Sequence, residues 1–222
     1  LYRQLLFHHR SVTSGPWKNL KHRNKELAGK ILGIYGLGRI GKALAQRAVA
    51  LGVKVQYFDV VRQSEAEKEW GLKYLFPEEL LSSSDIISYH LPKTSFTHHL
   101  INRNSLRKMR PDALLINSSR GYIQDENAIY EALTSGQISA AGLDVFEVEP
   151  LPEHSPLRKL ENVVLTPHSA PDNESFILAV RNALENLLRI SNGNEPQSIA
   201  VDHEEITRQF LERFPEVKLT VS

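Results

Sequence analysis

Three glycines at a fixed spacing separate an apolar run of the chain from a run with helical periodicity. The segment GIYGLGRIG spans residues 33–41, so Gly36, Gly38 and Gly41 follow the apolar residues 31–35 and lead into a helix-patterned segment. A strand that passes through a tight glycine turn directly into a helix begins a β-α-β unit. This segment therefore predicts a parallel sheet that is covered by helices.

The rest of the chain repeats this alternation of short apolar segments and helix-patterned segments. The expected strands are rich in Val, Ile and Leu, as buried parallel strands are, and comprise residues 31–35, 53–58, 86–89, 113–116, 141–145 and 163–165. The expected helices have apolar residues at every third or fourth position and comprise residues 40–51, 102–109, 126–133 and about 173–190. We therefore predict an α/β fold with a doubly wound parallel sheet.

Composition narrows the classes of partner. Of the 222 residues, 41% are hydrophobic and 24% are charged, values typical of a globular protein, and no apolar run is long enough for a membrane span. A formal net charge of +1 provides no field that would attract nucleic acid or an acidic membrane surface. The sequence contains no cysteine, which is compatible with a reducing compartment. We expect a cytoplasmic protein with no nucleic-acid and no membrane partner.

An acidic residue ends the second expected strand. Asp59 lies 18 positions beyond Gly41. At about this spacing in a Rossmann-type domain, a carboxylate accepts hydrogen bonds from the adenosine ribose, while the glycine turn and the helix N-terminus face the pyrophosphate. The Asp59 carboxylate would repel a 2′-phosphate, which favours NAD over NADP, although Arg62 keeps NADP open. The alternative is a glycine turn that holds no ligand.

Polar side chains also follow the later strands. Arg120, Glu149 and His168 come after the fourth, fifth and sixth expected strands, and open α/β sheets bind ligands beyond the carboxyl ends of their strands. A guanidinium can grip a carboxylate, an imidazole can exchange a hydroxyl proton, and a carboxylate can favour the charged imidazole. These residues predict an oxidoreductase that moves a hydride between nicotinamide and a small anionic substrate. The alternative is that these residues have no catalytic role: Arg120 would be a surface arginine, Glu149 a charged loop residue and His168 a histidine that bonds backbone groups at a strand end.

Five segments together resemble the D-isomer-specific 2-hydroxyacid dehydrogenase family, which includes phosphoglycerate dehydrogenases and glyoxylate/hydroxypyruvate reductases. They are ELAGKILGIYGLGRIGKALAQRA, DIISYHLPKTSFTHHLIN, LLINSSRGYIQDENAIYEAL, AAGLDVFEVEPLP and NVVLTPHSA, in the order and spacing of that family over about residues 17–192. By this resemblance, Arg120 binds the carboxylate of a small 2-hydroxyacid or 2-oxoacid, His168 is the acid/base and Glu149 is its partner. The resemblance implies further cofactor-binding residues beside the glycines and Asp59: Arg39 and Ile40 along the pyrophosphate, Leu91, Pro92 and Thr97 on the adenosine and pyrophosphate side, Ser118 and Ser119 at the nicotinamide ribose, and Asp144 at the nicotinamide carboxamide.

The resemblance also implies how the chain is organised. Residues 1–17 are expected to form a truncated inter-lobe helix, residues 18–170 the NAD-binding Rossmann domain, and residues 171–222 an inter-lobe helix and a C-terminal tail. The family builds its substrate lobe from an N-terminal segment of ~100 residues, a common domain size. We expect that lobe to be largely missing from this sequence. Because the family usually dimerises through the NAD-binding lobe, a homodimer is expected.

Two functions of different classes remain open. A dehydrogenase needs the proton-transfer pair of His168 and Glu149, whereas an NAD-binding regulatory or corepressor-like module without turnover needs only the fold. A formate dehydrogenase is disfavoured, because those relatives typically carry glutamine at the position that matches Glu149. The remaining candidates, His90, His98 and His99, are interpreted as strand-end and surface residues, since zinc would need a further converging ligand. No metal site is predicted.

Overall fold

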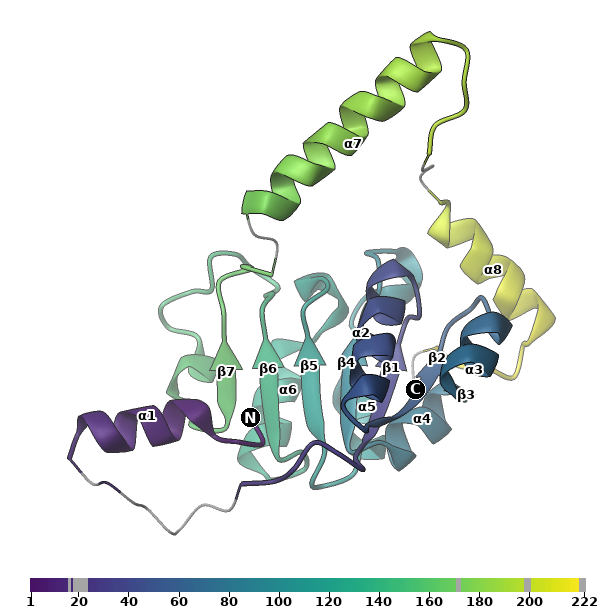
Figure 1. Ribbon diagram of the computed structural model, residues 1–222. Coiled ribbons are helices and arrows are strands. Elements are labelled where there is room, and N and C mark those ends of the chain that lie inside the picture. Colours follow the sequence, from purple (N-terminus) through teal and green to yellow (C-terminus); the bar gives the residue numbers. More distant parts are fainter. Residues whose placement is uncertain (16, 18–23, 171–172, 198–200, 220–222) are drawn as a thin grey trace.

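A seven-stranded parallel sheet forms the centre of the molecule. The computed structural model describes residues 1–15, 17, 24–170, 173–197 and 201–219. The sheet has the strand order β3-β2-β1-β4-β5-β6-β7 (Figure 1). Its strands are β1 (Ile31–Tyr35), β2 (Lys54–Phe58), β3 (Lys73–Tyr74), β4 (Ile86–Tyr89), β5 (Leu114–Asn117), β6 (Ala140–Leu143) and β7 (Val163–Leu165). From β1 the chain builds the sheet outward in one direction to β3, and from β4 it builds outward in the opposite direction to β7. This change of direction between β1 and β4 confirms the expected doubly wound fold.

The register of the sheet aligns the carboxyl ends of the strands. Tyr35 pairs with Phe58 on one side and with Tyr89 on the other. Asn117 continues this row, because it pairs with Tyr89 and with Leu143. The segments that follow the strands therefore leave the sheet along one edge, where ligands bind in open α/β folds.

Helices cover both faces of the sheet, and each face has its own apolar cluster. Figure 1 shows α2 in front of the sheet and α6 behind it. Ile34 and Tyr57 are buried in the cluster that includes residues of α2, whereas Ile87 and Leu115 are buried in the cluster that includes residues of α4, α5 and α6. The helices are α2 (Arg39–Ala50), α3 (Ser64–Trp70), α4 (Pro77–Ser83), α5 (Arg103–Lys108) and α6 (Glu126–Thr134), with short 3-10 turns at η1 (Ser95–Thr97), η2 (Gly121–Ile123) and η3 (Pro156–Lys159). Burial on both faces explains why the strands are mostly apolar.

Three further helices are α1 (Leu5–Thr13), α7 (Asn173–Ser191) and α8 (His203–Arg213), of which α8 contributes Phe210 to one of the two apolar clusters. In Figure 1, α7 projects away from the sheet and α8 returns to it beside β2 and β3. Apolar side chains of α7 are exposed, among them Phe176 at 69% and Leu184 at 56%, whereas Phe210 of α8 is buried. None of the helices in the described part of the chain combines the length and the apolar character needed to cross a membrane.

The sequence missed three short elements. The six expected strands and the four helices expected from their periodicity are confirmed with their ends within two residues, but β3, α3 and α4 were not expected. Within the helix expected at residues 1–17, α1 covers only Leu5–Thr13. Two residues are too few to show a strand period, and α4 has only two turns, so its stability comes from packing rather than from a visible pattern. Leu80 and Leu81 of α4 are at most 1% exposed. The expected domain boundary at residue 171 lies outside the described residues, and the proposed division of the chain stays a prediction.

Candidate functional site

The glycine turn after β1 packs tightly against the ends of the neighbouring strands. Gly36 has a φ of +98°, and its N–H donates to the Phe58 carbonyl at 2.8 Å. A Cβ on Gly36 would lie 2.5 Å from the His90 carbonyl oxygen, and one on Gly41 would lie 2.2 Å from the Gly36 oxygen. Side chains are therefore excluded at both positions, and the backbone of the turn is held in a fixed position.

The N-terminus of α2 opens from this turn without a side-chain cap. The N-cap residue is Gly38, which has no side chain to accept a hydrogen bond from the helix. A Cβ at this position would meet nothing within 4 Å. The first N–H groups of a helix have no intrahelical acceptors, so this end can receive an anion. Arg39 and Ile40, the first residues of α2, are both exposed beside the opening.

Asp59 lies at the end of β2 and faces the same turn. Its Oδ2 accepts a hydrogen bond from Leu37 N at 2.6 Å, and its Oδ1 accepts one from Val61 N at 2.9 Å. Burial raises the pKa of Asp59, although these two backbone donors oppose the shift. Each carboxylate oxygen retains a second lone pair, so Asp59 can still accept hydrogen bonds from ligand hydroxyls.

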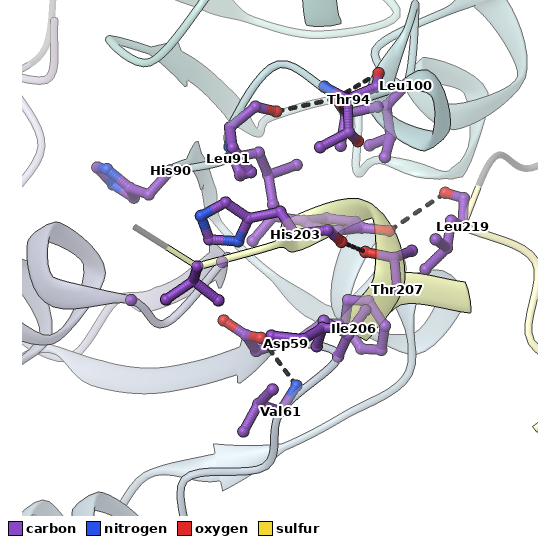
Figure 2. A pocket seen from close by; sticks show the side chains of 18 of the residues that line it. Asp59, Val61, His90, Leu91, Thr94, Leu100, His203, Ile206, Thr207 and Leu219 are labelled. Atoms are coloured by element: carbon purple, nitrogen blue, oxygen red, sulfur yellow. Dashed lines mark hydrogen bonds between the residues drawn. The ribbon is translucent and has the colours of Figure 1, made fainter. Parts of the chain in front are cut away.

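A cavity of about 250 Å³ lies between the glycine turn, Asp59 and the segment after β4 (Figure 2). The lining is largely apolar with a few polar groups, as is common in small-molecule sites. Leu91, Pro92 and Thr97, which sequence resemblance assigned to this end of a cofactor, all line it. The Thr97 hydroxyl donates to the Pro92 carbonyl at 2.9 Å and so braces the wall of the cavity.

His90 also lines this cavity, which the sequence did not predict. One ring nitrogen is 2.9 Å from the Ser88 hydroxyl, and burial lowers the pKa of His90 to about 4. His98 and His99 stack on one another, and His99 pairs with Glu147. In the described ranges, no three His, Cys, Asp or Glu residues are grouped so as to hold a metal ion.

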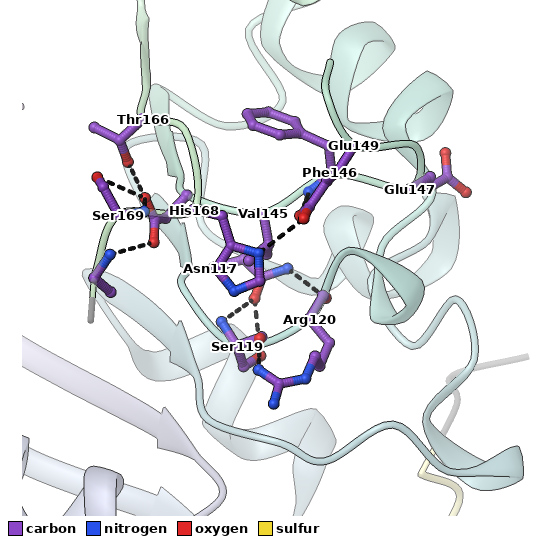
Figure 3. A network of polar contacts seen from close by, with 12 residues as sticks. Asn117, Ser119, Arg120, Val145, Phe146, Glu147, Glu149, Thr166, His168 and Ser169 are labelled. Carbon is purple, nitrogen blue, oxygen red and sulfur yellow. Dashed lines mark hydrogen bonds and ion pairs between the residues drawn. The ribbon is translucent and has the colours of Figure 1, made fainter. Parts of the chain in front are cut away.

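A second cluster of polar residues follows β5, β6 and β7 (Figure 3). Nδ1 of His168 lies 2.8 Å from Oε2 of Glu149, and Oε1 of Glu149 accepts from the Phe146 N–H at 3.0 Å. The hydrogen bond with His168, followed by the one from Phe146, lowers the pKa of Glu149. His168 has a φ of +51°, a conformation that costs a non-glycine residue about 1–3 kcal/mol. The surrounding loop therefore has to impose this conformation on the histidine.

Asp144 organises the loop that carries His168. Its Oδ1 accepts from the Thr166 hydroxyl at 2.5 Å and from Ser169 N at 3.0 Å, and its Oδ2 accepts from Ala170 N at 3.1 Å. Burial opposes ionisation of Asp144, but these donors outweigh it and lower the pKa of the carboxyl group. Sequence resemblance assigned Asp144 to the nicotinamide carboxamide. The contacts indicate that it also fixes the loop on both sides of His168.

The buried amide side chains of Asn117 and Gln124 hold the loop that carries Arg120, and neither residue was predicted from the sequence. Asn117 Nδ2 donates to the Arg120 carbonyl at 3.1 Å and to Gln124 Oε1 at 2.7 Å, and Gln124 Nε2 donates to the Val145 carbonyl at 2.9 Å. Both amides are 0% exposed. This network ties the Arg120 loop to the segment after β6. The only local signal is that Asn117 directly follows an apolar run and Gln124 directly follows Ile123; nothing in the sequence links the two residues.

The remaining predicted residues lie in the same loop. Ser119 is buried, and its N–H and hydroxyl both donate to Asn117 Oδ1, at 3.1 and 2.9 Å. Ser118 is exposed. The exposed Arg120 side chain donates from Nη1 to the Ser119 carbonyl at 2.6 Å, which engages one of the five N–H donors of the guanidinium.

All the predicted site residues thus lie along the carboxyl edge of the sheet or at the adjoining end of α2. They form two groups: an anion-accepting turn beside an apolar cavity with Asp59, and the cluster of Arg120, Glu149 and His168. The first group suits a dinucleotide, because it combines open helix N–H groups with a carboxylate that can bind ribose hydroxyls. The second suits proton exchange on a small anion.

Comparisons with known proteins identify the family and the fold. Residues 1–170 match the model of the D-isomer specific 2-hydroxyacid dehydrogenase, NAD binding domain. A glyoxylate reductase of Korarchaeum cryptofilum is 44% identical over 195 residues, which are 86% of this chain and 59% of that enzyme. The chain therefore spans about three fifths of the length of this curated relative.

Two solved structures show how closely the fold is shared. A D-lactate dehydrogenase with NAD+ from Lactobacillus jensenii superimposes with a TM-score of 0.79 at 30% identity, over 90% of this chain and 64% of that one. An acyclic imino acid reductase in complex with NADPH and D-Arg superimposes with a TM-score of 0.81 at 30% identity, over 90% of this chain and 63% of that one. The family expected from the sequence motifs is confirmed. The chain belongs to the D-isomer specific 2-hydroxyacid dehydrogenase family and carries its NAD binding domain.

Proposed function

We propose that the protein is an NAD-dependent oxidoreductase that interconverts a small D-2-hydroxyacid and the corresponding 2-oxoacid. The observation that carries the proposal is the 2.8 Å contact between His168 and Glu149 at the sheet edge that also bears the glycine turn and Asp59. A module that only bound NAD would have no use for such a proton-transfer pair. The proposal covers the whole protein, of which the relatives suggest that this chain is a part.

The glycine turn, the first turn of α2 and Asp59 are the residues that would hold NAD. Open N–H groups at Arg39 and Ile40 would bind the pyrophosphate, and Asp59 would accept hydrogen bonds from the adenosine ribose. Bound NAD supplies a nicotinamide ring that exchanges a hydride with the substrate carbon. The Asp59 carboxylate favours NAD over NADP, because it would lie close to a 2′-phosphate.

His168 is the proposed acid/base. Because Nδ1 faces Glu149, Nε2 is the nitrogen left to exchange a proton with the substrate oxygen. In the reducing direction the protonated ring donates this proton, and in the oxidising direction the neutral ring accepts it. Glu149 holds the ring in one orientation and places a carboxylate beside it. Arg120 would bind the substrate carboxylate with its remaining donors.

The other assigned residues support these groups. We propose that Ser118 and Ser119 contact the nicotinamide ribose and that Asp144, besides contacting the carboxamide, keeps the His168 loop in its strained conformation. We also propose a division into an inter-lobe helix at 1–17, an NAD-binding domain at 18–170, and an inter-lobe helix and tail at 171–222. The exposed apolar side chains of α7 suit burial in a homodimer.

Replacement of His168 by alanine tests the acid/base assignment. We expect kcat of the full-length enzyme to fall by about 10²–10⁴-fold, because the proton donor is lost, while NADH affinity stays nearly unchanged. Absorbance assays with glyoxylate, hydroxypyruvate and 3-phosphoglycerate would measure turnover, and calorimetry would measure affinity. His154→Ala, which removes an exposed histidine, is the matched control. An active His168→Ala enzyme would refute the assignment, and a wild type that binds NADH but reduces none of these acids would favour the regulatory module.

Replacement of Asp59 tests the cofactor preference. Asp59→Asn keeps the shape of the side chain and one acceptor oxygen, but it removes the charge. We expect NADH affinity to fall by about 10-fold or more, as for loss of a hydrogen bond to a charged group, and NADPH affinity to fall less or to rise. Fluorescence titration with both cofactors measures this difference. Equal losses for NADH and NADPH would argue against a role in ribose recognition.

Glu149→Gln tests the coupling of the pair through pH. The pKa of Glu149 is lowered by its contact with His168, so the carboxylate is charged throughout the neutral range. Glu149→Gln removes the negative charge that lies beside the His168 ring, and we expect the alkaline limb of the kcat profile for 2-oxoacid reduction to move to lower pH. Profiles of wild type and variant in one buffer series provide the measurement. An unchanged alkaline limb would mean that Glu149 does not act on His168.

A further inference from the structure

The cavity beside Asp59 has one wall that belongs neither to the sheet nor to its loops. Val201, His203, Ile206 and Thr207, from helix α8 and the residues just before it, line the same cavity as Gly36 and Asp59. Figure 2 shows His203 between Leu91 and Asp59. We propose that α8 is part of the cofactor site and that His203 and Ile206 bind the adenosine end of the dinucleotide. This inference rests on the proposed function, because it takes the cavity to be the adenosine site.

Apolar packing fixes α8 to the strands that bear the site. Phe210 packs edge-on against Phe58, with ring centroids 5.7 Å apart, and Phe58 immediately precedes Asp59. The Tyr35 hydroxyl donates to the Leu219 carbonyl at 3.1 Å, and Tyr35 immediately precedes Gly36. The helix and the segment after it are therefore anchored one residue away from the two groups that would hold the cofactor.

A polar contact fixes the opposite end of the helix to the far side of the cavity. The Glu204 carboxylate accepts hydrogen bonds from Ser95 N at 2.5 Å and from the Ser95 hydroxyl at 2.7 Å. Ser95 belongs to η1, the turn that also carries Thr97 in the cavity wall. With Phe210 on β2 and Glu204 on η1, α8 bridges the two sides of the cavity.

The chemistry of this wall suits adenosine. Ile206 offers an apolar surface to a base, and the His203 imidazole can donate or accept a hydrogen bond near the ribose hydroxyls that Asp59 would bind. Burial raises the pKa of Asp59, and the neighbouring His203 and Lys42 oppose this shift, so both lie close enough to act on the carboxylate. The match to the family's NAD binding domain ends at residue 170, so it assigns nothing to α8.

Calorimetric titration with ADP-ribose, which contains the adenosine end without nicotinamide, tests the proposal. Ile206→Trp places a large ring in the cavity, and we expect it to weaken ADP-ribose and NADH binding by at least about 10-fold, because the cavity is small. His203→Ala should weaken both by about 3- to 10-fold, the range for one lost hydrogen bond. Arg208→Trp is the matched control, because Arg208 is exposed on α8 and does not line the cavity. It should bind like wild type.

The outcomes separate this inference from the proposed function. Wild type that binds neither ADP-ribose nor NADH contradicts the cofactor assignment itself. Wild-type binding that neither cavity variant changes shows that α8 is not part of the site. Tighter ADP-ribose binding by His203→Ala shows that α8 obstructs the cavity instead. Circular dichroism checks that each variant is folded, and His203→Ala, which alters an exposed side chain, keeps the test decisive if Ile206→Trp does not fold.

Discussion

The close packing of the glycine turn against the ends of β1, β2 and β4 is the constraint on which the rest of the site depends. Gly36 donates to Phe58 and leaves no room for a Cβ against the His90 carbonyl. The same turn begins α2 at Gly38, which lines the cavity, and brings Leu37 N to the Asp59 carboxylate. A single backbone path thus positions both the helix end proposed to bind the diphosphate and the acid proposed to bind the ribose.

The proposed proton-transfer pair of His168 and Glu149 depends on a separate set of contacts. Asn117 and Gln124 join the loop after β5 to the segment after β6, and Asp144 holds the loop after β7. The three loops therefore position one another, and no single strand end creates the cluster. Leaving a buried amide or carboxylate without its hydrogen-bond partner costs free energy. The network therefore stabilises the His168 loop in the conformation with positive φ.

The features that could be predicted from the sequence are those that a short stretch of neighbouring residues determines. The glycine spacing, the apolar strands and Asp59 are visible within short windows, and the parallel register then brings their ends together. Asn117, Gln124 and α8 could not be assigned in this way, because their contacts join residues far apart in the chain. The hydrogen bond between Tyr35 and Leu219 spans 184 positions. The sequence around residue 203 was expected to belong to a C-terminal tail, and nothing in it indicated that His203 would line the cavity beside Asp59.

A carboxylate placed at the open helix end tests the central claim that α2 and the glycine turn receive the diphosphate of the cofactor. Gly38 has a φ of −73° and space for a Cβ, so Gly38→Asp should fold, and its side chain should cap α2 as aspartate does at many helix N-termini. The account predicts an unchanged or raised unfolding temperature together with NADH affinity reduced at least about 10-fold, because the added charge occupies the N–H groups and repels the diphosphate. Gly38→Ala, which adds no charge, should weaken binding much less. Wild-type NADH affinity in a folded Gly38→Asp protein would contradict the account.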